Sequence, residues 1–125
     1  MIGTHMNKTI LAALGALFMA AAPVSQAADL AAGKAAFEKY TCVTCHGADG
    51  KTTTLPSYPV LAGQHQDYLV HALRTYKRGQ SGAPATANVR KNAIMGAMVG
   101  QLSEDDIQNI AAWLAAQPSA LSVSK

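Results

Sequence analysis

Cys42 and Cys45 are separated by two residues, and His46 follows the second cysteine directly, in a sequence of 125 residues that has no other cysteine. A disulfide that closed so short a loop would restrict the unfolded chain very little, so it would stabilise the fold only weakly. We therefore expect the two thiols to have a chemical purpose rather than a structural one.

The spacing Cys-x-x-Cys-His is typical of covalent haem attachment. Each thiol can add to one of two neighbouring vinyl groups on the porphyrin edge, and the two intervening residues let the backbone follow that edge. The residue after the second cysteine is then turned under the ring, where its imidazole reaches the iron. The motif predicts one haem bound through Cys42 and Cys45, with His46 as an iron ligand.

Two other uses of paired cysteines fit this sequence less well. A thioredoxin-type redox pair requires a βαβ setting, and no strand-like segment precedes Cys42. A zinc site requires a second pair of ligands, and no further cysteine is present to provide one. Haem attachment is therefore the interpretation that we favour.

The N-terminal residues read as a secretory signal peptide. Lys8 precedes an apolar run over residues 10–22, and small residues follow where signal peptidase cleaves. The run is too short to span a bilayer comfortably as an anchor. We expect residues 1–27 to be an added leader and a signal peptide cleaved after Ala27. Residues 28–125 are then a single mono-haem domain in the periplasm, with no stable membrane insertion.

Helical periodicity dominates the rest of the chain, and no segment reads as a strand. Asp29 can cap a first helix, and a second runs from about Gln66 to Lys77, where Gly79 is placed to stop it. Ser103 and three acidic residues after it begin the last helix, which Pro118 ends. We predict an all-α fold with three main helices and long loops. One haem would fill the centre that so short a chain fills poorly by itself.

Two methionines are candidates for the second axial position of the iron. Met95 and Met98 are the ones that follow the predicted cleavage site, both in a short segment before the last helix. A thioether from either one would favour ferrous iron. A ligating histidine also needs its other ring nitrogen held, and the carbonyl group of Pro59 is a candidate acceptor for the Nδ1 proton of His46.

The formal net charge of +3 is mildly basic. It comes without a dense basic run or interleaved aromatic residues, so nucleic acid is not an expected partner. Two basic clusters, at residues 74–78 and 90–91, most simply promote solubility. Pairing with haem propionates or steering an acidic redox partner is the alternative. His65 and His71 are expected to be exposed rather than to ligate iron.

These features together resemble those of a class I cytochrome c, and in particular of one domain of the cytochrome c4 and c-553 group. In that family the axial methionine lies seven residues before the leucine that opens the last helix, here Leu102. The resemblance therefore implies Met95 as the ligand, with Met98 as the second choice. It rests on Gly33, Phe37, the segments 42–47, 58–64, 68–69 and 102–107, and the stretch 110–114.

The resemblance also implies that the first and last helices cross at Gly33 and Phe37, against Ile110 and Trp113. It implies an electron-transfer protein rather than an enzyme, a monomer that shuttles single electrons between donor and acceptor proteins through a His/Met-ligated haem. The alternative is the haem subunit of an oxidoreductase complex with a flavin or sulfur-oxidising partner. A gas sensor or peroxidase would require the methionine to leave the iron.

Overall fold

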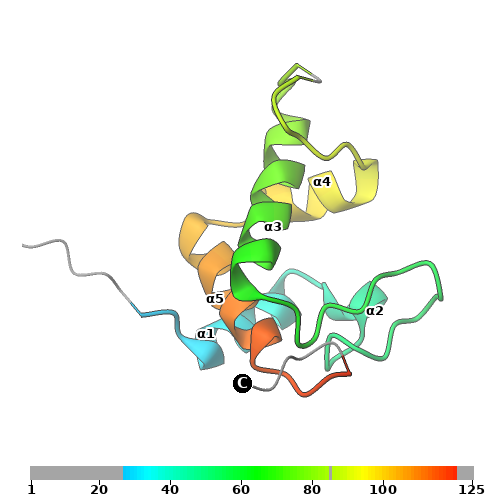
Figure 1. Cartoon of the computed structure of the whole chain (residues 1–125), viewed down its shortest axis with the longest axis vertical. Coiled ribbons are helices and arrows are strands. Elements are labelled where there is room, and N and C mark those ends of the chain that lie inside the picture. The colour runs from blue at the N-terminus through cyan, green and yellow to red at the C-terminus, as the bar shows by residue number, and fades with distance from the viewer. Residues whose placement is uncertain (1–26, 85, 121–125) are drawn as a thin grey trace, which may run out of the picture.

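The computed structural model describes residues 27–84 and 86–120, which form five helices and no strand (Figure 1). The predicted all-α class is therefore confirmed, and the predicted leader and signal peptide lie, up to residue 26, outside the described residues. None of the described helices is long and apolar enough to cross a membrane. The helices are α1 (Leu30–Lys39), α2 (Val43–His46), α3 (Gln66–Gln80), α4 (Ala93–Gly100) and α5 (Glu104–Ala115).

The first helix, α1, begins where the sequence predicted. The side chain of Asp29 accepts hydrogen bonds from the backbone N–H groups of Ala31 (2.8 Å) and Ala32 (3.1 Å), which have no partner inside the helix. The backbone N–H of Asp29 donates to the side chain of Asn109 at 2.8 Å. The start of α1 is thereby tied to the middle of α5.

The last helix, α5, starts with a reciprocal cap. The Ser103 hydroxyl accepts from the backbone N–H of Asp106 at 3.1 Å, and the Asp106 carboxylate accepts from the backbone N–H of Ser103 at 2.9 Å. The same carboxylate accepts from the hydroxyl of Tyr40 at 3.1 Å. The C-terminal end of α1 and the N-terminal end of α5 are therefore joined as well.

Between these two ties α1 crosses α5 at very short range. A Cβ atom at position 33 would overlap the backbone carbonyl oxygen of Asn109, so only glycine allows this approach. One turn later the rings of Phe37 and Trp113 lie 5.1 Å apart, tilted by 46°. The crossing at Gly33 and Phe37 that the resemblance implied is present.

The third helix, α3, is longer than predicted. We expected Gly79 to stop it, but the helix continues to Gln80 and that prediction is wrong. A Cβ atom at position 79 would overlap the carbonyl oxygen of Arg90, on the segment that returns along α3. The glycine is there to let that segment approach, and it does not end the helix.

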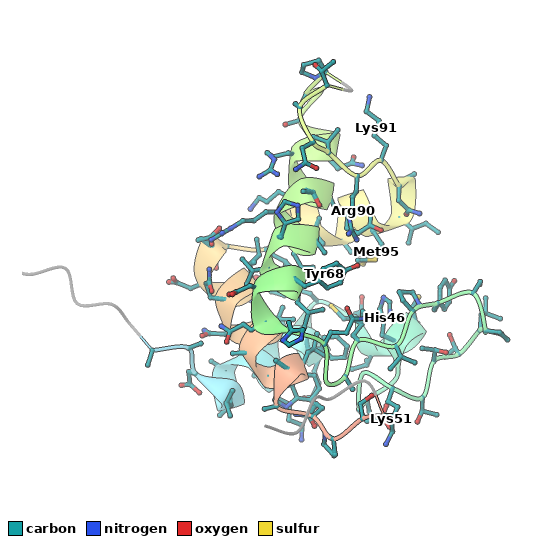
Figure 2. All side chains as sticks on the ribbon, viewed as in Figure 1. His46, Lys51, Tyr68, Arg90, Lys91 and Met95 are labelled. Carbon is teal, nitrogen blue, oxygen red and sulfur yellow. The ribbon has the colours of Figure 1, made fainter. Side chains whose placement is uncertain are left out.

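The segment with the two methionines is itself a helix, α4, which packs against α3 and carries Met95 (Figure 2). Its N-cap is Asn92, whose side chain accepts from the backbone N–H of Met95 at 2.9 Å. Gly96 faces α3, where a Cβ atom would overlap the side chain of Gln80. With the single turn of α2, this adds two short helices to the three main ones predicted.

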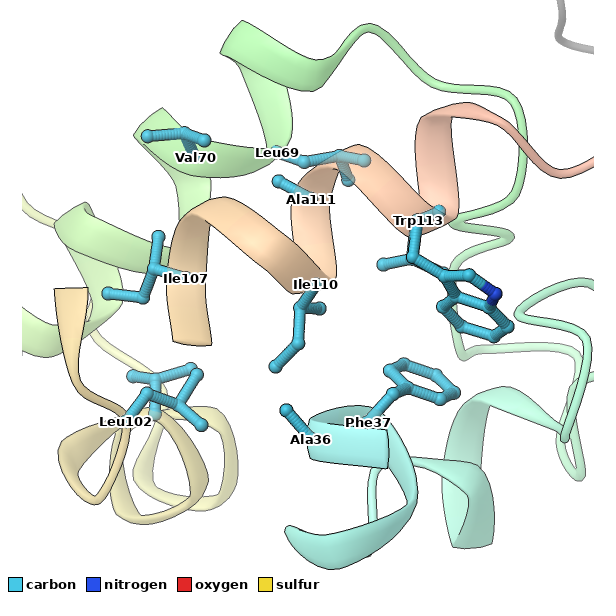
Figure 3. Close-up of a cluster of buried hydrophobic side chains, with 11 residues drawn as sticks. Ala36, Phe37, Leu69, Val70, Leu102, Ile107, Ile110, Ala111 and Trp113 are labelled. Atoms are coloured by element: carbon cyan, nitrogen blue, oxygen red, sulfur yellow. The ribbon is translucent and has the colours of Figure 1, made fainter. Parts of the chain in front are cut away.

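The hydrophobic core lies where α1, α3 and α5 meet, with α4 closing one end (Figure 3). Phe37 and Ile107 are each 1% exposed, and Leu114 is 2% exposed. This core anchors the inner ends of the helices, while the outer parts of α2, α3 and α4 project beyond it. The buried members of the cluster are Ala36, Phe37, Leu69, Val70, Val99, Leu102, Ile107, Ile110, Ala111, Trp113 and Leu114.

Candidate functional site

A cavity of about 580 Å³ lies among α2, α3 and α4, and residues of α1, α5 and the loop before α3 complete its wall. Its volume is within the usual range for sites that hold small molecules and cofactors. The wall is mainly apolar, because it continues the hydrophobic core outward. Apolar residues of α1, α3, α4 and α5 contribute, among them Phe37, Leu69, Leu73, Val99, Ile110 and Leu114.

The imidazole of His46 is buried in this wall, only 5% exposed, and its orientation is set by one hydrogen bond. Its Nδ1 atom lies 3.1 Å from the carbonyl oxygen of Pro59. A carbonyl oxygen can only accept, so Nδ1 carries the proton and Nε2 keeps its lone pair. Burial lowers the pKa of His46, and the hydrogen bond to Pro59 opposes that shift only in part. His46 is therefore a neutral imidazole with Nε2 available to a metal.

Cys42 and Cys45 are both half-buried, both free, and both on the cavity wall. Burial raises the pKa of the Cys42 thiol to about 11. Reactive pairs of the thioredoxin type need a thiolate, and therefore a lowered pKa. A Cys42 thiol that stays protonated at neutral pH does not fit that chemistry, so the pair does not match a redox centre of the thioredoxin type.

The backbone just before Cys42 holds an unusual conformation. Thr41 has φ +57°, a left-handed value that a β-branched residue rarely adopts. This conformation ends α1 and redirects the chain into α2, so that Cys42 and His46 lie one helical turn apart, joined by a backbone hydrogen bond of 3.0 Å. Threonine is not a residue that predicts positive φ, so this conformation could not be expected from the residue type.

Met95 and Met98 lie three residues apart on α4, and both are half-buried in the cavity wall. Met95 also packs against the hydrophobic core, whereas the Met98 sulfur is 4.0 Å from the Thr41 hydroxyl. Met95 on α4 and His46 on α2 belong to different sides of the cavity (Figure 2). The structure therefore brings both candidate methionines to the site that contains His46 and the two cysteines.

The residues on this wall fit a haem better than a bare metal ion. Among residues 27–84 and 86–120, no group of three or more His, Cys, Asp or Glu side chains could hold an ion by itself. A porphyrin brings four nitrogen ligands of its own, so the protein needs to add only axial ligands. One imidazole, a methionine thioether from either of two candidates, two thiols and apolar walls are the set that suits such a group.

The other histidines in the described part of the chain lie elsewhere. His65 and His71 are both exposed and neither is on the cavity wall, as their placement in the sequence predicted. By contrast, Tyr58, Tyr68 and Arg90 are on the wall. Sequence reasoning considered Arg90 only as part of a basic cluster, because its position depends on how the segment before α4 returns along α3.

Comparison with known proteins gives consistent results. The family model described as cytochrome c matches residues 30–117. Cytochrome c-554(548) of Halomonas halodenitrificans is 41% identical over 78 residues, which cover 62% of this chain and 84% of that protein. A protein of Thiomonas intermedia named thiosulfate dehydrogenase electron acceptor is 37% identical, with coverage of 82% of this chain and 40% of its own.

A solved structure is similar as well. The crystal structure of reduced recombinant cytochrome c4 from Pseudomonas stutzeri matches with a TM-score of 0.64 and 38% sequence identity. The match covers 74% of this chain and 47% of that one. The chain spans about half the length of the curated cytochrome c4 relatives that it matches, between 49% and 51% of three of them.

Proposed function

This chain belongs to the cytochrome c family and binds haem c covalently, and on that premise we propose that it carries single electrons between redox proteins. When bound, haem supplies an iron that alternates between the ferrous and ferric states. The residues of the chain attach that group, ligate it and keep water away from it. One observation carries the proposal: two thiols, an imidazole and two thioethers meet in one apolar cavity.

Cys42 and Cys45 are the proposed attachment residues. Each Sγ would hold the haem through a thioether bond to a vinyl carbon, and the thiol hydrogen would go to the carbon next to it, so the addition would release no other product. Support comes from the place of both side chains on the cavity wall, one turn of α2 apart. The Cys-x-x-Cys-His motif requires the same pairing.

His46 is the proposed proximal ligand, with Pro59 as the residue that positions it. The hydrogen bond to the Pro59 carbonyl fixes the tautomer and the plane of the ring, and it makes Nε2 more basic. Burial supports this role because it keeps the imidazole neutral. A protonated ring would have no lone pair to offer.

Met95 is the proposed second axial ligand, and Met98 is the second choice. The backbone of Met95 is fixed by the Asn92 cap at the start of α4, and its side chain is packed against the core. A ligand held in this way loses little conformational freedom when it binds. The sulfur of Met98 instead lies 4.0 Å from the hydroxyl of Thr41.

Iron held by His46 and Met95 has no position left for a substrate, so we assign the chain to electron carriers and not to enzymes. The apolar wall keeps the surroundings of the iron similar in both oxidation states. We also propose that residues 1–27 are removed on export, leaving a monomeric mono-haem domain over residues 28–125 in the periplasm. Attachment to Cys42 and Cys45 would follow export.

A second candidate function is that of the haem protein that accepts electrons from a sulfur-oxidising enzyme. The observation that favours it is the match to proteins named thiosulfate dehydrogenase electron acceptor, in two organisms. Both candidate functions use the same site. They differ in whether the partner binds stably, and co-migration of a partner with the extracted protein in its native host distinguishes them.

Carbon monoxide binding tests the closed site directly. The absorption spectrum of the matured, reduced protein should not change when carbon monoxide is added. The same protein should exchange electrons rapidly with small redox proteins. Met95→Ala should open the position and bind the gas, which serves as the positive control. Rapid binding by the unsubstituted protein would instead indicate a gas sensor or peroxidase.

A further inference from the structure

Arg90 brings a formal charge to an otherwise uncharged cavity. Of the described residues on the wall, it is the one side chain that is charged at neutral pH, with histidine counted as neutral. The other titratable groups there are the two cysteines and His46 on the α2 side, Tyr58 on the loop, and Tyr68 and Tyr76 on α3. The residues that α4 contributes are uncharged. Arg90 is only half-buried, so its cation keeps contact with water and is accessible to an anion that binds in the cavity.

The backbone of Arg90 is fixed against α3 at two points. Its N–H donates to the carbonyl oxygen of Thr75 at 3.1 Å, and Thr75 is 1% exposed. Its own carbonyl oxygen lies against Gly79, where any side chain would overlap it. The position of Arg90 is therefore set by the packing of the fold rather than by a free loop.

The side chain of Arg90 is held by two tyrosines of α3. Its Nη2 atom lies 3.3 Å from the hydroxyl of Tyr68, and its guanidinium carbon is 5.4 Å from the ring centroid of Tyr68 and 5.6 Å from that of Tyr76. Cation–π contacts of this kind orient the guanidinium group without neutralising it. Figure 2 shows Arg90 and Tyr68 together.

Most of the hydrogen-bonding capacity of this group is unused. A guanidinium has five N–H donors, and among the described residues the hydrogen-bond partners of this one are two neutral hydroxyls, those of Tyr68 and Tyr76. The ion pairs of the described part of the chain join Lys34 to Glu38 and Arg74 to Glu104, so no carboxylate of these residues pairs with Arg90. A planar fork of donors that faces a cavity is suited to a carboxylate ligand.

We propose that Arg90, held between Tyr68 and Tyr76, binds a propionate carboxylate of the haem. This inference rests on the proposed function, because it requires the haem to be attached at Cys42 and Cys45. The vinyl groups and the carboxylates of a haem lie on different edges of the ring. With the vinyl edge joined to α2, the carboxylates must meet another part of the wall, and α3 with the segment before α4 provides it. Arg90 thus supplies the charge that keeps a propionate ionised.

Neighbouring basic side chains do not take this role. Arg74 pairs with Glu104, Lys77 donates to the carbonyl group of Leu102, and Arg78 donates to that of Asn88. Lys91 is exposed and is not on the cavity wall. It is adjacent to Arg90 and has the same charge, which makes it a matched control.

The test is the reduction potential of the matured holoprotein between pH 5 and pH 8, for the unsubstituted protein, Arg90→Gln, Arg90→Lys and Lys91→Gln. An arginine partner lowers the pKa of a carboxyl group by roughly 1–3 units. Arg90→Gln should therefore move the pH midpoint of the potential upward by about that amount, into the measured range. Arg90→Lys should move it less, because lysine keeps the charge but not the fork or the stacking. Lys91→Gln should leave the profile unchanged.

The proposal is wrong if Arg90→Gln has the profile of the unsubstituted protein, or if Lys91→Gln shifts it equally. If Arg90→Gln fails to mature, Arg90→Lys and Tyr68→Phe decide the matter, since both keep the cation and alter only how it is held. If both of these variants have the same pH profile of the potential as the unsubstituted protein, the role is refuted as well. A failure of the proposed function itself would look different, because the unsubstituted protein would then carry no covalent haem.

Discussion

The Nδ1 atom of His46 and the carbonyl oxygen of Pro59 lie 3.1 Å apart, although the two residues are 13 positions apart in the sequence. This hydrogen bond closes the loop between α2 and α3 over the buried imidazole. The backbone of the loop is itself fixed, because Leu61 and Ala62 both donate to the carbonyl oxygen of Gly50, at 2.8 and 3.0 Å. The histidine is therefore oriented by the protein before any ligand binds.

Replacement of Pro59 by glycine tests that orientation. The carbonyl group remains, but the loop gains backbone freedom and the bond to His46 weakens. Loss of a bond worth about 1 kcal/mol corresponds to a roughly fivefold faster exchange of the Nδ1 proton with solvent. The ring N–H resonance in the reduced holoprotein measures this rate. Pro56→Gly is the control: Pro56 is in the same loop and exposed like Pro59, but the carbonyl that binds His46 belongs to Pro59, so the rate should be unchanged.

The choice between the two methionines can be settled by the weak sulfur-to-iron absorption band of the oxidised protein. Met95→Ala should abolish the band, because the thioether that we place on the iron is lost. Met98→Ala should keep it, because that side chain reaches Thr41 instead. The opposite pattern, with the band lost only in Met98→Ala, would show that our ligand assignment is wrong.

The crossing of α1 and α5 should tolerate nothing larger than glycine. Gly33→Ala places a methyl group against the carbonyl oxygen of Asn109 and 2.8 Å from Cβ of Trp113, so the helices must separate. We expect a loss of about 2 kcal/mol in the free energy of unfolding, measured in denaturant on the holoprotein. Gly100→Ala at the end of α4 meets no atom within 4 Å and should change it by less than about 0.5 kcal/mol. Equal effects would contradict the close packing at Gly33.

Acid stability should depend on Asp106. Burial acts to raise the pKa of this carboxyl group, but hydrogen bonds from Ser103 and Tyr40 outweigh it and hold the pKa below its ordinary value of 3.8. A carboxylate with a lowered pKa stabilises the folded state above its unfolded pKa, and this contribution is lost as the pH falls through its folded pKa.

Asp106→Asn should therefore lower stability by about 1 kcal/mol at pH 7 and flatten its decline below about pH 4. Thermal unfolding between pH 2 and pH 7 measures both effects. Asp105→Asn, a neighbouring exposed residue of the same turn, is the control and should alter stability by less than about 0.5 kcal/mol. If the stability of Asp106→Asn falls at low pH as steeply as that of the unsubstituted protein, the capping carboxylate is not the cause of the acid destabilisation.

The elements with local signals could be predicted from the sequence. The caps at Asp29 and Ser103 are short-range hydrogen-bond patterns, and the apolar spacing of α3 and α5 reflects the one face that each buries in the core. The Cys-x-x-Cys-His motif likewise depends only on neighbouring residues. These features needed no knowledge of the tertiary structure.

The remaining features depend on contacts between distant segments. In α4 the sequence from Ala93 to Gly100 is almost entirely apolar, since one side meets the core and another lines the cavity, so it has no amphipathic period to recognise. A glycine at position 79 is a typical residue for the end of a helix. Its actual role, to make room for the carbonyl group of Arg90, depends on the segment that returns along α3. The left-handed conformation of Thr41 is one that a β-branched residue rarely adopts, so its residue type does not predict it.

The central claim is that haem is joined to this chain at Cys42 and Cys45, and peptide mass analysis of the exported, matured protein tests it most directly. After acid extraction and proteolysis, the mass of one haem should remain on the peptide that contains residues 42–46. Cys42→Ala and Cys45→Ala should each reduce the attachment to one bond. Haem that extracts freely, with both thiols unmodified or joined to each other, would contradict the account.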